Sequence, residues 1–172
     1  MDKLVALALR EMIRHNRGDQ KRVEHSVKVF GYAQILGRLE GLSIDNQYVL
    51  ELTAALHDIG IHVAELKFGY CNGQLQELEG PPVAREILEA IGVSAEVVDR
   101  VCFIVGKHHT FSAIDGIDFQ LLVEADFLVN SVEEAVSPEG VRRFVEANFK
   151  TESGRMLILD LFPLNFPSRF LF

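Results

Sequence analysis

Apolar residues recur along the chain at intervals of three and four positions, the spacing that places them on one face of an α-helix. Over residues 20–39 this predicted face carries Val23, Val27, Phe30, Ala33 and Leu36. The same periodicity predicts further helices at about residues 4–13, 46–58, 81–91, 95–109, 119–135, 138–148 and 153–161. No segment shows the alternating pattern of a β-strand, so the sequence predicts an all-α fold.

Small polar residues and prolines mark where these helices should begin. Ser43, Ser94 and Pro138 precede or open apolar-periodic runs, as helix-starting residues do. Residues 60–80 instead carry several glycines, and we expect there a long loop with about one helical turn, in which Lys67, Tyr70 and Asn72 are candidate specificity contacts. Pro81 and Pro82 then suit the first turn of the next helix, because a proline there loses no helical hydrogen bond.

Length and composition fit one soluble globular domain over residues 1–172, with 48% hydrophobic and 24% charged residues. The formal net charge of −8 argues against nucleic acid or an anionic membrane as the main partner. The two cysteines, Cys71 and Cys102, show no metal-type spacing and are expected to be ordinary thiols.

The N-terminal segment is not expected to be a signal peptide, and the last residues of the sequence are unusually apolar. The first apolar run is short and is followed by charged residues, and no run reaches the ~18 apolar residues that a membrane span needs. We therefore expect a cytoplasmic protein. Phenylalanines in the tail suggest a surface for a homo-oligomer, or a tail folded back on its own helices: Phe162, Phe166, Phe170 and Phe172.

Several ionisable side chains fall among apolar neighbours, where an unpaired charge would be costly. They are His25, His57, Asp58, Glu79, His108, His109 and Asp126. Taken singly, Glu79 suits the start of a helix and His108-His109 a solvated helix end. Taken together, imidazoles mixed with carboxylates suit first-row transition metals better than calcium, and seven ligands suit two ions that share a carboxylate.

The order His, His-Asp, His-His, Asp resembles the HD superfamily of metal-dependent phosphohydrolases, over about residues 20–130, with "HDIG" as the densest match. The resemblance implies a helical bundle with the metals between its helices, followed here by further helices and the apolar tail over 138–172. It also implies a first metal bound by His25, His57, Asp58 and Asp126, and a second bound by Asp58, His108 and His109, with Glu79 at the remaining ligand position. Iron or manganese is the expected metal, with cobalt, nickel, zinc or magnesium as alternatives. His15 and His62 match no position of the pattern.

The same resemblance implies a reaction. A metal-bound hydroxide, held at His57 and Asp58, would attack a phosphate monoester or anhydride of a nucleotide or other small metabolite. Lys107 immediately precedes His108, and Lys28 lies one helical turn after His25, so both are candidates for binding the phosphate. Two alternatives stay open: a diiron oxygenase acting on a small polyol or phosphonate, and a non-catalytic signalling domain, against which the retained ligands argue.

Overall fold

The computed structural model describes residues 2–163, which form nine α-helices, one turn of 3-10 helix and no strand. The all-α prediction is confirmed. In chain order the elements are α1 (Lys3–His15), α2 (Gln20–Leu39), α3 (Ile44–Leu56), α4 (Ile61–Phe68), α5 (Gly73–Ala90), α6 (Ala95–Val105), η1 (Phe111–Ala113), α7 (Ile117–Glu133), α8 (Pro138–Asn148) and α9 (Glu152–Leu161).

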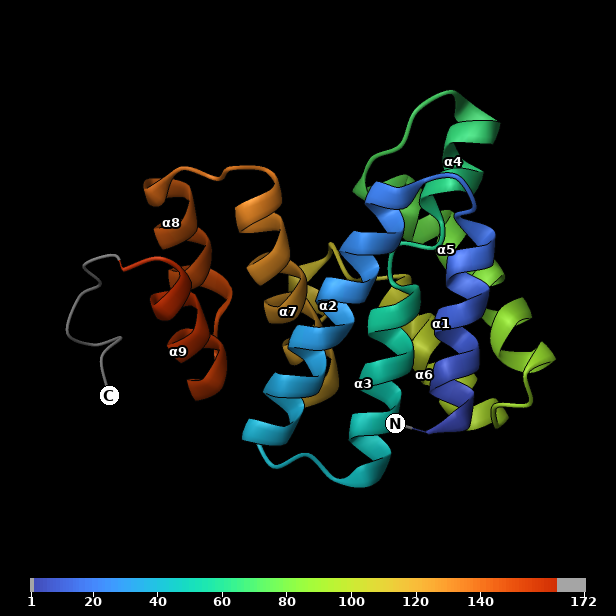
Figure 1. Cartoon of the computed structure of the whole chain (residues 1–172), viewed down its shortest axis with the longest axis horizontal. Helices are drawn as coiled ribbons and strands as arrows, with labels where there is room; N and C mark the ends of the chain where they lie inside the picture. Colours follow the sequence, from blue (N-terminus) through green and yellow to red (C-terminus); the bar gives the residue numbers. More distant parts are fainter. Residues whose placement is uncertain (1, 164–172) are drawn as a thin grey trace.

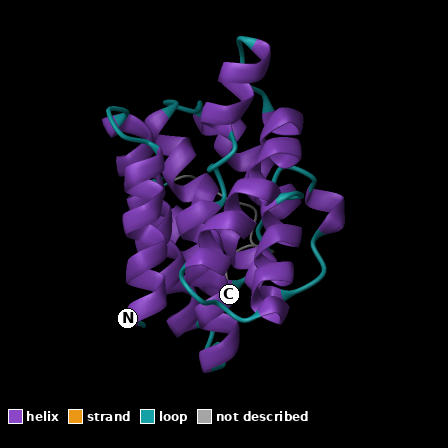
Figure 2. Ribbon diagram, turned by 90° about the vertical axis from the view of Figure 1, so that its right-hand side faces the viewer, coloured by secondary structure: helices purple, strands orange, loops and turns teal. Residues whose placement is uncertain are grey.

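Helix α3 lies at the centre of this bundle (Figure 1) and contacts α1, α2, α6 and α7. Every residue from Val49 to Leu56 is buried, because the helix has neighbours on several sides. Helix α2 packs against both α3 and α7, and α5 packs against α6. The view in Figure 2 shows that the connections between these helices are loops and turns throughout. The C-terminal end of α3 is therefore surrounded by other helices, and His57 and Asp58 follow directly there.

Most of the predicted helix starts agree with the structure. The carboxylate of Asp19 accepts a hydrogen bond from the Arg22 backbone N–H (3.1 Å) at the start of α2, and Ser43 caps α3 in the same way. Ser94 occupies the N-cap position of α6, although its hydroxyl makes no capping hydrogen bond. The prediction of a buried Val27 on α2 is wrong. Val27 is 45% exposed, whereas His25, on the opposite side of the helix, is buried.

The expected loop over residues 60–80 is wrong. The stretch holds α4 and the first half of α5, which begins after Asn72, whose side chain accepts a hydrogen bond from the Leu75 N–H (2.9 Å). Pro81 and Pro82 lie inside α5 rather than at its start. Of the glycines that suggested a loop, Gly69 ends α4 in a left-handed conformation, whereas Gly60 and Gly80 serve helix packing.

Gly60 shows why these glycines are needed. A Cβ atom built on Gly60 would lie 2.5 Å from the backbone nitrogen of Gly80 and 2.8 Å from the carbonyl oxygen of Gln76. The turn after α3 therefore touches the backbone of α5, which only glycine permits. This contact places one face of α5 directly over the end of α3.

Other sequence expectations meet the described structure only in part. No helix among residues 2–163 is long and apolar enough to cross a membrane. Phe162 packs against the core, but most of the apolar tail, residues 164–172, lies outside the described residues, so its role as an interface stays a prediction. His15 and His62 lie beside each other, with ring centroids 6.0 Å apart.

Candidate metal centre

Four side chains from three parts of the bundle converge beyond the end of α3. Nε2 of His25, from α2, lies 3.2 Å from Oδ1 of Asp126, on α7, and 3.5 Å from Oδ2 of Asp58. Nε2 of His57, at the C-terminal end of α3, lies 3.5 Å from the same Asp58 oxygen and 3.6 Å from Asp126 Oδ1. We call these four residues the first cluster.

The outer nitrogens of both imidazoles are held by acceptors. Nδ1 of His25 lies 2.9 Å from Oε2 of Glu133, and Nδ1 of His57 lies 3.0 Å from the carbonyl oxygen of Ala54. Because a carboxylate and a carbonyl only accept, each Nδ1 must carry the proton. Each Nε2 then presents a lone pair to the centre of the cluster, which is the tautomer of a metal-binding histidine.

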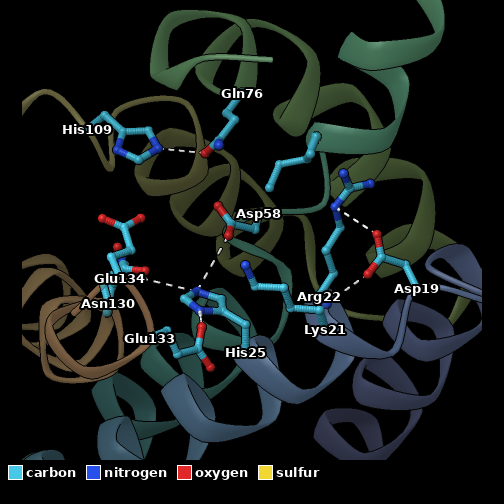
Figure 3. A pocket seen from close by; sticks show the side chains of 12 residues that line it. Asp19, Lys21, Arg22, His25, Asp58, Gln76, His109, Asn130, Glu133 and Glu134 are labelled. Atoms are coloured by element: carbon cyan, nitrogen blue, oxygen red, sulfur yellow. Dashed lines mark hydrogen bonds and ion pairs between the residues drawn. The ribbon is translucent and has the colours of Figure 1, made fainter. Parts of the chain in front are cut away.

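A second group of ligand atoms lies on the other side of Asp58. Oδ1 of Asp58 is 3.4 Å from Nε2 of His108, whose Nδ1 donates to the carbonyl oxygen of Val105 (2.8 Å). The amide oxygen of Gln76, on α5, lies 3.2 Å from Nε2 of His108 and 2.6 Å from Nε2 of His109 (Figure 3). We call Asp58, Gln76, His108 and His109 the second cluster, and Asp58 belongs to both.

The donor set of these clusters fits a divalent cation. Nε2 of His25 and Nε2 of His57 lie 3.3 Å apart, and both face the carboxylates of Asp58 and Asp126. Burial by itself would lower the pKa of His57, but the charges of Asp58 and Asp126 outweigh it and raise this pKa to about 9. Likewise burial opposes the charge of Asp58, but His57 and His108 hold its pKa at about 2. The cluster therefore requires positive charge at its centre, and an ion bound there takes the place of the protons.

Three residues in each cluster already meet the distance requirement of an ion site. One ligand atom from each of His25, His57 and Asp58 lies within 4.8 Å of the others, and the same holds for Asp58, His108 and His109. The structure thus brings together six of the seven predicted ligands, with Asp126 joining the first cluster through His25 and His57.

Glu79, the seventh predicted ligand, is not brought into either cluster. Its buried carboxylate pairs with Lys67 of α4. Gln76 lies one helical turn earlier on α5 and occupies the place expected for Glu79. The sequence does not single out Gln76, because the glycines of this segment predict a loop rather than a helix. In a helix that starts after Asn72, the three-residue spacing of Gln76 and Glu79 would have made both of them candidates.

Two expected phosphate-binding lysines also lie elsewhere. Lys28 is exposed and pairs with Glu133 (2.8 Å), so it supports the carboxylate that holds His25. Lys107 is exposed in the turn before His108, outside the pocket described next. The cations that do reach the pocket are Lys21 and Arg22, which precede His25 by about one turn of α2. Their spacing from His25 is the signal that sequence reasoning overlooked.

A pocket of about 350 Å³ opens above the two clusters. Its lining comes from α2, the turn after α3, α4, α5, the segment after α6, and α7 with the residue that follows it. The lining residues are Asp19, Lys21, Arg22, His25, Asp58, Ile61, Gln76, His109, Asp126, Asn130, Glu133 and Glu134. A ligand in this pocket would contact both clusters.

A helical bundle that gathers imidazoles and carboxylates around one shared aspartate defines a divalent-metal-binding protein. A family model of the HD domain matches residues 22–143, and the chain belongs to this family, which is of the metal-dependent phosphohydrolase type. The resemblance seen in the sequence is thereby confirmed.

Among solved structures, the chain is similar to the crystal structure of a predicted HD superfamily hydrolase from an uncultured Thermotogales bacterium. The two share 21% sequence identity with a TM-score of 0.62, over 92% of this chain and 82% of the other. At this identity the similarity supports the fold. A search of curated proteins found no match.

Proposed function

We propose that the protein is a phosphohydrolase that cleaves a phosphate monoester or anhydride of a small metabolite, with divalent ions held by the first and second clusters. The observation that carries the proposal is the position of Asp58, whose two oxygens face different clusters at the floor of the pocket. Two ions bound there would supply an acidified water and positive charge for the phosphoryl oxygens. Iron or manganese suits this mixture of imidazoles and carboxylates.

The chain itself fixes the geometry of the first cluster. Glu133 holds the ring of His25, and the carbonyl of Ala54 holds that of His57. The side-chain amide of Asn130 donates to Oδ1 of Asp126 (2.8 Å) and so fixes this carboxylate from the pocket side. Such outer hydrogen bonds orient ligands before an ion or a substrate arrives.

His109 and Arg22 are placed to act at the mouth of the pocket. Partial burial and the charge of His108 lower the pKa of His109, which keeps its ring neutral and able to bind a metal near pH 7. The guanidinium of Arg22 lies at the pocket, where Glu65 (2.6 Å) and Asp19 (3.2 Å) fix its orientation and offset its charge. An oriented guanidinium can donate hydrogen bonds to a phosphate.

The proposal is tested by measuring metal content and phosphate release on the same protein. The chain is stripped with a chelator, reloaded with Fe(II) or Mn(II) under anaerobic conditions, and assayed for release of inorganic phosphate from nucleotides, sugar phosphates and polyol phosphates. We expect metal-dependent hydrolysis in the reloaded protein and none in the stripped protein. A metal-loaded protein that releases no phosphate from any of these compounds would contradict the proposal.

The same protein separates the alternative functions. Oxygen uptake by the iron-loaded form in the presence of polyols or phosphonates would favour the oxygenase. Failure to bind any divalent ion would favour a non-catalytic signalling domain.

A further inference from the structure

The pocket above the clusters has two chemically different walls. Lys21 and Arg22 extend from α2 on one side, and Asn130 and Glu134 lie on the opposite side, with His25 and Asp58 between them (Figure 3). Cations on one wall and hydrogen-bond acceptors on the other select for a ligand with an anionic end and a hydrogen-bond-donating end.

Lys21 is the cation left available to a ligand. Its side chain makes no hydrogen bond or ion pair with any residue of the described part of the chain, whereas Arg22 pairs with Asp19 and Glu65. Its ammonium extends toward His25 and Asp58 in the pocket (Figure 3). A phosphate group lying on the clusters would therefore come within reach of Lys21.

The opposite wall offers acceptors. Asn130 uses its side-chain N–H to bind Asp126, so its amide oxygen remains to accept a hydrogen bond from a ligand. Glu134 is exposed at the end of α7, and its carboxylate pairs with no described residue. Hydroxyl groups are the natural partners of both side chains.

The lining also offers a nucleobase few stacking partners, since the imidazoles of His25 and His109 face the two clusters. Of residues 2–163, no phenylalanine or tyrosine lines this pocket, and Ile61 is the only aliphatic residue that does. A planar base is normally bound by stacking on an aromatic side chain or between apolar ones. In addition, about 350 Å³ lies at the small end of the roughly 300–1,000 Å³ that small-molecule pockets span.

We infer that the substrate is the phosphate monoester of a small polyhydroxylated compound, a sugar or polyol phosphate, and not a nucleotide. This inference rests on the phosphohydrolase function proposed above. Lys21 pairs with the phosphoryl oxygens, while Glu134 and Asn130 accept hydrogen bonds from the hydroxyl groups. Water adds to phosphorus, the bond from phosphorus to the ester oxygen breaks, and the products are inorganic phosphate and the free alcohol.

The test compares kcat/KM of the metal-loaded protein for a panel of sugar and polyol phosphates with that for nucleoside monophosphates. We expect the best polyhydroxylated substrate to exceed the best nucleotide by about tenfold or more, the worth of one or two hydrogen bonds. A nucleotide that is hydrolysed better than every sugar or polyol phosphate would overturn this inference and leave the phosphohydrolase function standing. No hydrolysis at all would instead remove the function on which it rests.

Two variants test the roles of the two pocket walls. Lys21→Ala should raise KM about 10- to 100-fold for all phosphate esters, with metal content unchanged. The affinity for inorganic phosphate, measured by calorimetric titration, should fall by a similar factor. Glu134→Ala should raise KM for polyhydroxylated substrates and leave methyl phosphate, which has no hydroxyl group, unaffected. Lys3→Ala, an exposed lysine of α1 outside the pocket, is the matched control. Unchanged KM and phosphate affinity in Lys21→Ala, or equal effects of Glu134→Ala on both kinds of substrate, would overturn the assignment.

Discussion

Oδ1 of Asp58 lies 3.4 Å from Nε2 of His108, while the other oxygen of the same carboxylate lies 3.5 Å from Nε2 of His25. Among the described residues, Asp58 alone belongs to both groups that could hold a metal ion. Its position in the turn directly after α3 gives it access to α2 on one side and to the residues after α6 on the other. The two candidate ion sites are therefore linked through one side chain.

Removing this link should affect both sites at once. We expect Asp58→Ala to lose both ions and all hydrolysis, because each site gives up a charged ligand. Metal per chain, measured by elemental analysis after reloading, checks the prediction. Asp160→Ala, an exposed carboxylate of α9, should keep the wild-type metal content. Two ions retained in Asp58→Ala would exclude the shared-carboxylate arrangement.

Glu133 should matter for the first site without touching the ion. It accepts hydrogen bonds from Nδ1 of His25 (2.9 Å) and from Lys28 (2.8 Å), and so fixes the orientation of the ring. We expect Glu133→Ala to lower the affinity for the first ion by about 10- to 100-fold, the usual effect of losing a hydrogen-bond partner of a ligating histidine. Glu133→Gln, which can still accept from His25, should fall between this variant and the wild type. Competition with a metallochromic chelator measures both, and equal affinity in all three proteins would contradict a positioning role.

Gln76 should set the affinity of the second site. An amide oxygen is neutral and binds a transition metal more weakly than imidazole does. Gln76→His is therefore expected to raise the affinity for the second ion, and Gln76→Ala to lower it, with the first ion unchanged in both. Metal titration by calorimetry resolves the two sites. Loss of the second ion in Gln76→His would show that the amide is required there.

Glu79 provides the contrast, because its carboxylate pairs with Lys67 rather than with the cluster. Glu79→Ala should leave both ions bound at wild-type affinity. Since Lys67 is half exposed, the loss of this pair should cost about 1 kcal/mol or less of the free energy of unfolding. A lower affinity for the second ion in Glu79→Ala would show that Glu79 takes part in this site.

Periodic patterns were sufficient to predict most of the fold, because they report local physics. Helix α2 is bounded by the cap at Asp19, and α8 begins at Pro138 as expected. The failure at residues 60–80 has a tertiary cause. Gly60 is required by the contact of its turn with the backbone of α5, and Gly80 by the close approach of the Val105 side chain. The same residue type appears in the sequence whether a glycine serves a turn or such a contact.

The residues of the candidate site also differ in whether local sequence or tertiary packing identifies them. His57 and Asp58 are adjacent in the sequence, so a motif can identify them without any knowledge of the fold. Gln76 and Lys21 enter the site only through the rotation of α5 and α2 about their own axes. That rotation is set by packing against α3 and its neighbours, which no short motif records.

Glu124 is a buried carboxylate away from the metal clusters. It accepts hydrogen bonds from the backbone N–H groups of Lys150 (2.7 Å) and Thr151 (3.1 Å), and from the side chain of Gln120 (2.7 Å). It therefore ties α7 to the segment between α8 and α9. Glu124→Ala leaves these donors buried without a partner and should cost about 1–3 kcal/mol of the free energy of unfolding, measured in urea.

The pH dependence of this anchor follows from its burial. Desolvation raises the pKa of Glu124 above its ordinary value of 4.5, although its hydrogen bonds oppose the rise. The folded state therefore binds the proton of Glu124 more tightly than the unfolded state does. The stability that this proton contributes is fully present below a pH of about 4.5 and is lost as the pH rises through the folded-state pKa. Glu124→Gln should remove the dependence. The free energy of unfolding of the wild type minus that of Glu124→Gln should decrease from acidic to neutral pH. An increase in this difference would contradict the prediction.

Gly60 carries the last prediction, because the "HDIG" turn touches α5 at this residue. The three atoms nearest to an added Cβ belong to the backbone of Gln76 and Gly80, so no side-chain rotation can relieve the clash. We expect Gly60→Ala to cost about 1–3 kcal/mol of the free energy of unfolding, and to move α5 with Gln76 away from Asp58. The second ion should then weaken more than the first. Gly31→Ala, in α2, is the matched control, since its Cβ meets nothing within 4 Å and should leave stability unchanged or raise it by up to about 1 kcal/mol. Equal stability and equal affinity for both ions in the two variants would mean that the turn and α5 do not need their close contact.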